Sequence, residues 1–492
     1  AWKGYEYCYA EIKNLSIKER YERYDKHTIG GIEFGMGAIN LAISSLPTRI
    51  MRLVAIFGLP HDRDAGFKLL NQSIDGLPKE IKCAENENRR GIRSPLAAVI
   101  ICGYYILIPS FAPILAEEYI PKGEAILAQE RKYLPKSALH WWLQGRAHRA
   151  KRNLKQAGES FANAARGGND FVQIVHVNFY ELGFNFLFGS QWQAAEKMFS
   201  VLLRDNTWSK AFYAYVVAVC VNMSGRKEEA IKLYAKAPKY IERTYGGKVL
   251  SVEQFVLRRS KSRQNKGSQS AVRDAVELCY LWNGFPQTPY CQLQVFLTML
   301  EDQEKELIKS ELLSESEFES NQNNDDDNEI KDDDNDDNVE EKVERDLEEE
   351  QKMLSMFENS PVGDKDSFDF KHVKVSNPDI SDEVIQRTDI IEELAVLWLL
   401  RACLLKELKQ FDVAQALYQR LARLEKMQLV KQEKWVFPYA LFDWASLRYA
   451  QNDFQACLSL LDRIAKFSDF NFEYRLFLRA HLLKNATNEK LN

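Results

Sequence analysis

The sequence lacks the motifs on which most enzyme classes depend. Its 492 residues contain no serine or cysteine nucleophile motif, no His-Glu-x-x-His pair and no phosphate-binding glycine loop. The seven histidines are dispersed, and none of the eight cysteines belongs to a Cys-x-x-Cys pair. Scattered cysteines in a chain of this length are typical of reduced thiols in an intracellular protein. We therefore predict a non-enzymatic, cytoplasmic protein without catalytic residues, a metal site or a cofactor.

Signals for β-structure are also rare. Alternating apolar and polar residues are almost missing, and the turn formers are few, with 23 glycines and 14 prolines. Apolar residues instead recur at helical spacing through most of the chain. The hydrophobic content of 45% is sufficient for large cores, and the length exceeds what one core usually organises. These features predict an all-α protein with several domains or a solenoid.

One long stretch is free of charge. Residues 94–116 hold no charged side chain and are long enough to cross a bilayer, but Pro109 and Pro113 interrupt them. The run is therefore either a membrane anchor or two short buried helices joined near Pro109. We adopt the buried helices and expect any membrane association to be peripheral. An integral anchor through residues 94–116 is kept as the alternative.

Acidic residues are concentrated in one segment. Glu311 to Glu350 contain 20 acidic and 3 basic residues, which leaves a net charge of +12 on the remainder of the chain. Residues 314–385 hold too few aromatic residues to offset the entropy of ordering, so we predict a disordered acidic insert. A basic run at residues 257–270 has no interleaved aromatic residues, so it predicts a solvated helix end and no nucleic-acid partner.

Three consecutive windows match the tetratricopeptide repeat. This repeat of about 34 residues is a pair of antiparallel helices, with small residues where the helices cross and aromatic residues between units. The matching residues, window by window, are Trp141, Gly145, His148, Ala157, Phe161 and Ala164; Phe179, Leu182, Gly183, Phe186, Ala195, Phe199 and Leu202; and Ala214, Val217, Ala218, Val221, Ala230, Tyr234 and Ala237.

The pattern returns beyond the acidic segment, first at Trp398, Ala402, Leu405, Ala414, Tyr418 and Leu421. A weaker copy places Trp444 at the small-residue position, followed by Leu447, Ala456 and Leu460, which predicts a modified terminal unit. Before Pro135 the repeats match poorly. There Gly31, Gly35, Ala38 and Ala42 share one helix face and predict the close approach of another helix.

The chain is thus predicted to be a tetratricopeptide-type α-solenoid of antiparallel helix pairs, in four parts. These parts are an atypical N-terminal helical region (1–135), a set of repeats (136–300), the disordered acidic insert (314–385) and C-terminal repeats (386–492).

The N-terminal region also carries a family resemblance. The block from Gly30 to Leu41, with Leu46-Pro47, Phe57-Gly58 and Asp62-Arg63 after it, resembles the hallmark block of the tetratricopeptide repeat protein 39 family, which includes a yeast inclusion-body-clearance and mitochondrial outer-membrane protein. The resemblance covers nearly the whole chain except the acidic insert. It implies an adaptor in lipid homeostasis or protein clearance, at the mitochondrial outer membrane or lipid droplets. It also implies that further helices precede residue 1.

The first helices of such repeats line a concave groove, which in this chain would be aromatic with two arginines. Guanidinium groups bind carboxylates through two parallel hydrogen bonds, so the groove suits an extended peptide segment of another protein that carries a carboxylate. The alternative is that Trp142 and Tyr180 only pack against neighbouring helices. The predicted groove residues are Trp142, Arg146, Arg149, Tyr180, Phe184, Leu187, Tyr215, Val219 and Asn222.

Overall fold

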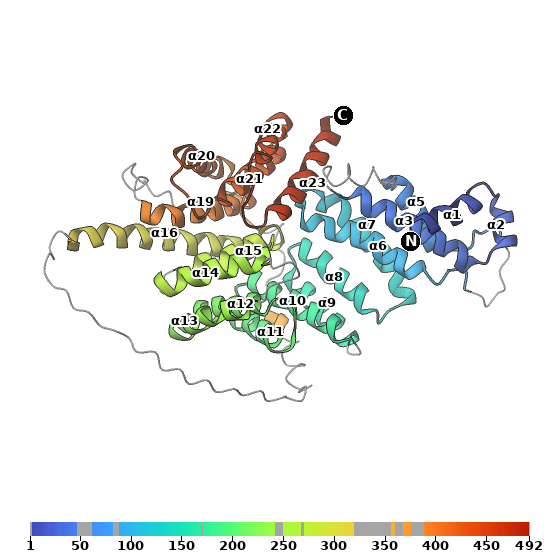
Figure 1. The fold of residues 1–492 in the computed structure, drawn as a ribbon, viewed down its shortest axis with the longest axis horizontal. Helices are drawn as coiled ribbons and strands as arrows, with labels where there is room; N and C mark the ends of the chain where they lie inside the picture. The colour runs from blue at the N-terminus through green and yellow to red at the C-terminus, as the bar shows by residue number, and fades with distance from the viewer. Residues whose placement is uncertain are drawn as a thin grey trace. The chain divides into compact units, whose positions relative to one another are not determined.

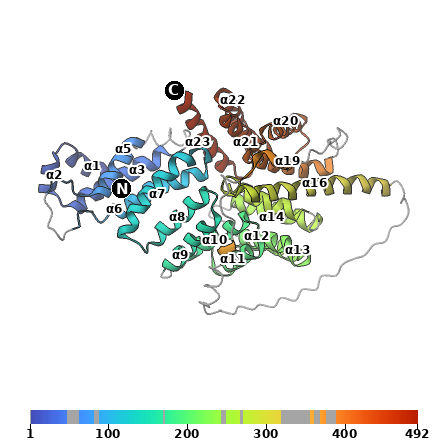
Figure 2. The ribbon, with the colours of Figure 1, turned by 180° about the vertical axis from the view of Figure 1, so that it is seen from behind.

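The described part of the computed structural model is helical, which confirms the all-α prediction. No strand is found in the residues that the structure describes, which are 2–46, 62–81, 88–168, 171–241, 249–266, 270–318, 356–359, 368–375 and 388–491. These residues form two compact units, which Figures 1 and 2 show from opposite sides. Unit 1 contains residues 1–181 and 445–492, and unit 2 contains residues 182–444.

The helices of the N-terminal region and of the first repeats are α1 (Trp2–Lys13), α2 (Ile17–Arg23), α3 (Lys26–Ser44), α5 (Arg63–Asp75), α6 (Ser94–Leu107), α7 (Ala116–Tyr133), α8 (Ala138–Ala150), α9 (Leu154–Gly167), α10 (Val172–Phe188), α11 (Trp192–Asp205), α12 (Lys210–Met223) and α13 (Lys227–Lys236). The later helices are α14 (Ser251–Lys266), α15 (Ala271–Leu281), α16 (Tyr290–Phe318), α19 (Thr388–Glu407), α20 (Phe411–Met427), α21 (Val436–Ala450), α22 (Phe454–Ile464) and α23 (Glu473–Leu491). Short 3-10 turns lie at Ile108–Ser110, Pro113–Leu115, Ala237–Tyr240, Phe285–Gln287, Met356–Asn359 and Phe370–His372.

In unit 1, small residues bring α3 and α5 together. A Cβ added to Gly37 would lie 2.9 Å from the backbone nitrogen of Leu70, and one added to Gly66 would lie 2.9 Å from that of Leu41. Gly35 instead lies beneath the ring of Tyr5 from α1, and Gly31 has open space around it. The predicted close approach is therefore seen at Gly35, which receives the Tyr5 ring of α1, whereas the α3–α5 contact uses Gly37 and Gly66, which lie outside the predicted face.

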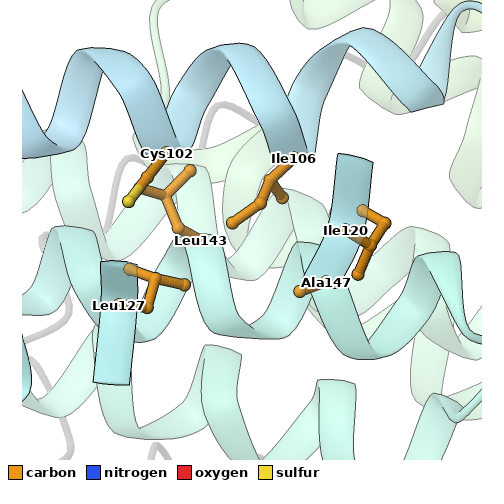
Figure 3. Close-up of a cluster of buried hydrophobic side chains, with 6 residues drawn as sticks. All are labelled: Cys102, Ile106, Ile120, Leu127, Leu143 and Ala147. Carbon is orange, nitrogen blue, oxygen red and sulfur yellow. The ribbon is translucent and has the colours of Figure 1, made fainter. Parts of the chain in front are cut away.

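The uncharged run 94–116 folds into α6 and two 3-10 turns, with breaks at its prolines. Figure 3 shows Cys102 and Ile106 of α6 pointing into a cluster with Ile120, Leu127 and Leu143 of α7 and α8. Both α6 residues are fully buried. Within the described residues, no helix combines the length and the apolar character needed to cross a membrane.

A single type of turn joins the two helices of each repeat. In the α8–α9 turn the Asn153 N–H donates to the His148 carbonyl at 3.0 Å, and Arg152 has a φ of 63°. This is the Schellman motif, in which a left-handed residue ends a helix and a later N–H bonds back to the last turn. The same bond and a positive φ recur in the turns at Ser190, Gly225, Asn283, Lys409 and Asn452.

The hydrogen bonds of these turns show that the predicted register of the last repeat is wrong by one residue. The Asp453 N–H donates to the Arg448 carbonyl at 2.9 Å, and the Cys457 N–H donates to the Asp453 carbonyl. By comparison with the α8–α9 turn, Cys457 takes the place of Ala157, and Ala445 takes the place of Gly145. The small residue of the first helix is thus Ala445 rather than Trp444. Since Ala445 and Cys457 are both fully buried, this last unit has ordinary repeat packing.

The range predicted as a disordered insert is only partly described. Helix α16 runs into it and ends at Phe318, and residues 356–359 and 368–375 are described within it. The rest of residues 314–385 lies outside the described residues. Residues 368–375 belong to unit 2 and pack on its helix α16 through Phe368 and Phe370, both of which lie against Tyr290.

Candidate functional site

Helices α8 and α10 are the first helices of adjacent repeats, and they place the first predicted groove residues beside each other. Trp142, Arg146 and Arg149 lie on α8, and Tyr180 lies on α10. Within the first of these repeats, Gly145 of α8 lets the ring of Phe161 from α9 pack directly on the α8 backbone. Trp142, Arg146 and Tyr180 are partly exposed, whereas Arg149 is buried.

Glu181 of α10 is the partner of both arginines. Arg146 Nη1 donates to the two carboxylate oxygens of Glu181 at 3.0 and 3.2 Å, and Arg149 Nη2 donates to Oε2 of the same group. Trp142 Nε1 donates to Glu181 Oε1 at 3.2 Å. In this structure the arginine pair binds a carboxylate of the chain itself, Glu181, and the expected carboxylate of a partner segment stays a prediction.

The electrostatics of this cluster keep Glu181 ionised. Burial alone raises the pKa of Glu181, but the charges of Arg146 and Arg149 outweigh it and leave the pKa below its usual value. Arg146 Nη2 also donates to Ser110 Oγ at 2.8 Å, which ties α8 to the 3-10 turn after α6. Since a buried charge is costly without a partner, this cluster fixes how α8 and α10 pack.

The remaining predicted groove residues belong to unit 2 and are buried. Phe184 stacks on Trp282 with ring centroids 5.3 Å apart. Tyr215 packs against Tyr234 and Phe255, and Asn222 is 4% exposed. Leu187 and Val219 are also fully buried. The interpretation of these residues as an open groove surface is wrong, because neighbouring helices cover them.

The exposed part of the predicted site is smaller and lies in unit 1. Leu139, Trp142 and Arg146 follow one face of α8, while Val177 and Tyr180 follow one face of α10. Leu139 and Val177 are large apolar side chains that are 42% and 48% exposed. We call these five residues the α8–α10 surface. It combines two exposed apolar side chains, two aromatic rings and one guanidinium group already bonded to Glu181.

Unit 2 holds a buried network of charges that sequence reasoning missed. Arg259 of α14 pairs with Glu277 and Glu433, and Arg263 binds Asp274 through two hydrogen bonds of 2.6 and 2.7 Å. The prediction of a solvated basic helix end at 257–270 is therefore wrong for Arg259 and Arg263, which are buried. The available signal was the helical spacing of Arg259 and Arg263 together with the charged residues Arg273, Asp274 and Glu277 in the otherwise apolar helix α15.

The network joins segments that lie on either side of the acidic stretch. Its positive members are Arg258, Arg259, Arg263 and Arg273, and its negative members are Asp274, Glu277, Glu393 and Glu433. The charges balance, which is what allows their burial. Among the described residues no group of three or more histidine, cysteine or acidic side chains could hold a metal ion.

The sequence model of the family Iml2/Tetratricopeptide repeat protein 39 matches residues 1–334. The chain belongs to this family. The resemblance at Gly30–Leu41 is thereby confirmed. The matched residues of this Iml2/Tetratricopeptide repeat protein 39 chain include the α8–α10 surface and continue past the end of α16. Helices α19 to α23 lie beyond the match, yet the turns at Lys409 and Asn452 have the same form as those inside it.

Proposed function

We propose that this chain is a non-enzymatic scaffold that holds an extended segment of a partner protein on the α8–α10 surface. The observation that supports the proposal is the exposure of Leu139 and Val177 beside Trp142 and Tyr180. Aromatic and arginine side chains are enriched where proteins bind one another. The partner segment would bury its apolar side chains against these residues, while Arg146, which is held by Glu181, borders them.

The test introduces charge into this surface without breaking the buried cluster. Leu139→Glu and Val177→Glu change side chains that no described ion pair uses, whereas changes at Arg149 would leave Glu181 buried with one fewer partner. We expect the double variant to lose the proteins captured by the full-length chain after crosslinking in cells. The matched control is Ile231→Glu on α13, where the replaced side chain is 37% exposed.

Quantitative mass spectrometry of the captured proteins separates the outcomes. Loss of the same partners from the double variant, but not from the Ile231→Glu control, supports the proposal. Unchanged capture by a double variant with an unchanged melting temperature removes the α8–α10 surface from consideration.

The family resemblance supports a cellular role that the fold does not define. We propose that the partners act in lipid homeostasis or protein clearance at an organelle surface, the mitochondrial outer membrane or lipid droplets. Proximity labelling with the full-length chain, with and without residues 314–385, tests this, since labelled proteins from neither compartment would contradict it. We also propose that any membrane association is peripheral, so that alkaline carbonate releases the chain. Resistance to carbonate would favour the anchor at residues 94–116.

A further inference from the structure

A short segment of the acidic stretch is packed on the helices of unit 2. Phe368 and Phe370 both contact Tyr290, at the start of α16, with ring centroids 5.6 and 4.9 Å from its ring. The two phenylalanine rings also contact each other edge to face at 5.1 Å. Lys409 places its ammonium group 4.2 Å from the ring centroid of Phe370. Together these contacts give the segment an aromatic and cation–π anchor.

The remaining contacts are made to the backbone of the segment. Gln410 Nε2 donates to the Phe370 carbonyl at 2.8 Å, and Gln294 Nε2 donates to the Lys374 carbonyl at 3.0 Å. The side chains of Asp369 and His372 point away and are 58% and 84% exposed. Recognition therefore uses two phenylalanine rings, spaced by one residue, and the carbonyls of Phe370 and Lys374, at the start of the 3-10 turn Phe370–His372 and just after it.

The receiving residues belong to the repeat framework. Lys409 is the left-handed residue of the α19–α20 turn, and its neighbour Gln410 closes that turn through its backbone N–H. Helix α16 is held to α19 by Arg401, which pairs with Glu301 and Glu304, and by Trp398 Nε1, which donates to Glu304. None of these bonds uses residues 368–375, so the receiving surface does not depend on the segment for its own position.

We propose that Tyr290, Gln294, Lys409 and Gln410 form a second peptide-binding surface, which takes a short segment of the pattern Phe-x-Phe followed by a tight turn. In this chain residues 368–374 occupy it and thereby block it. A partner protein with the same pattern binds only when the internal segment leaves. This surface lies in unit 2 and does not rest on the function proposed for the α8–α10 surface.

The internal segment competes with a free peptide for this surface, and it is favoured because it belongs to the same chain. A tethered ligand acts at an effective concentration on the order of 1 mM, so a free peptide with a Kd of about 10 µM for the empty surface would bind the occupied chain roughly 100-fold more weakly. The acidic stretch would then act as a regulator, because any change that releases Phe368 and Phe370 opens the surface to a partner.

The test uses the full chain and a fluorescent peptide with the sequence of residues 366–376. The freed variant, Phe368→Ala with Phe370→Ala, should bind the peptide with saturation, and the unchanged chain should bind it at least tenfold more weakly. A peptide with both phenylalanines replaced by alanine should not bind. Adding Gln294→Ala and Gln410→Ala to the freed variant removes two hydrogen bonds and should weaken binding about tenfold or more.

The matched control is Gln254→Ala on α14. The side chain of Gln254 also donates to a backbone carbonyl, that of Val249, but it lies outside the proposed surface. This change should leave peptide binding to the freed variant unaltered. Absence of saturable binding by a freed variant that retains its helical circular dichroism would overturn the proposal. The segment would then be a fixed structural part of unit 2. Equal binding by the freed variant and the unchanged chain would also overturn it, because the peptide would then bind elsewhere.

Discussion

Arg259 and Glu433 form a buried pair although 174 residues separate them in the sequence, with Arg259 Nη2 donating to Glu433 Oε2 at 3.0 Å. Arg259 lies on α14, before the acidic stretch, and Glu433 lies just before α21. Both are almost inaccessible to solvent. Trp435 Nε1 also donates to Glu433, so one carboxylate binds both a tryptophan two residues away and an arginine from the other side of the acidic stretch.

The first prediction concerns this carboxylate. Glu433→Gln removes the charge that faces Arg259 and Arg258, and it should lower the free energy of unfolding by about 3 kcal/mol, since the buried network is left with one positive charge in excess although Arg259 keeps Glu277. Urea denaturation followed by tryptophan fluorescence measures the change. The control is Lys484→Ala, which breaks the exposed pair with Asp462 and should cost at most about 1 kcal/mol. Equal effects of the two substitutions would contradict the prediction.

The second prediction is that the acidic stretch can be cut without separating the two parts of the chain. Arg273 of α15 pairs with Glu393 of α19 at 2.8 Å, and Tyr280 donates to Asp443 at 2.6 Å. We expect a chain cleaved at a protease site placed within residues 320–350 to elute as one complex in size-exclusion chromatography. In the cleaved chain, Arg401→Glu sets a third carboxylate against Glu301 and Glu304 and should release the C-terminal fragment. Separation of the fragments without this change would contradict the prediction.

The repeats were predictable from sequence because their signal is local. Gly145 and Gly183 are small since the rings of Phe161 and Phe199 pack on the helix backbone at those points. The position of the turn before Ala157, between the two helices of the repeat, follows from the fixed length of the repeat. The last repeat was misread by one residue because Trp444 and Ala445 are adjacent, and only the hydrogen bonds of the Asn452 turn fix the register.

The site was harder to predict because its contacts are not local. Arg146 and Arg149 carry a recognisable anion-binding pattern, but their partner Glu181 lies on the next repeat. The burial of Tyr215 depends on α14, which shows no repeat pattern in the sequence. Residues 368–375 were assigned to disorder from composition, and two phenylalanines are too few to change a compositional average.

The third prediction compares one substitution at two helical glycines of unit 1. Gly145→Ala would place a Cβ 2.5 Å from the Phe161 ring and should destabilise the unit by about 1 to 3 kcal/mol, the usual cost of overpacking. Gly31→Ala meets open space and should stabilise the unit by about 0.5 to 1 kcal/mol, because alanine is the better helix former. Thermal unfolding followed by circular dichroism gives both signs. Two shifts of the same sign would show that the α8–α9 contact is looser than described.

The fourth prediction concerns Glu33, a buried carboxylate of α3. Its burial raises the pKa to about 7, and the charge of Arg20 only partly opposes this. Because the pKa in the folded state lies above that of an unfolded glutamate, the protonated form favours folding. The stability that Glu33 contributes is therefore complete below about pH 4.5 and is lost as the pH rises through 7.

Glu33→Gln should remove this pH dependence, because the amide cannot ionise. At pH 8 the variant should be more stable than the unchanged chain by about 2 to 3 kcal/mol, and the two should converge towards pH 5. Urea midpoints measured across this range for both proteins isolate the contribution of Glu33, since all other ionisable groups are shared. Parallel pH profiles would mean that the Glu33 carboxylate is ionised in the folded protein at neutral pH, with a cation or water near enough to stabilise its charge.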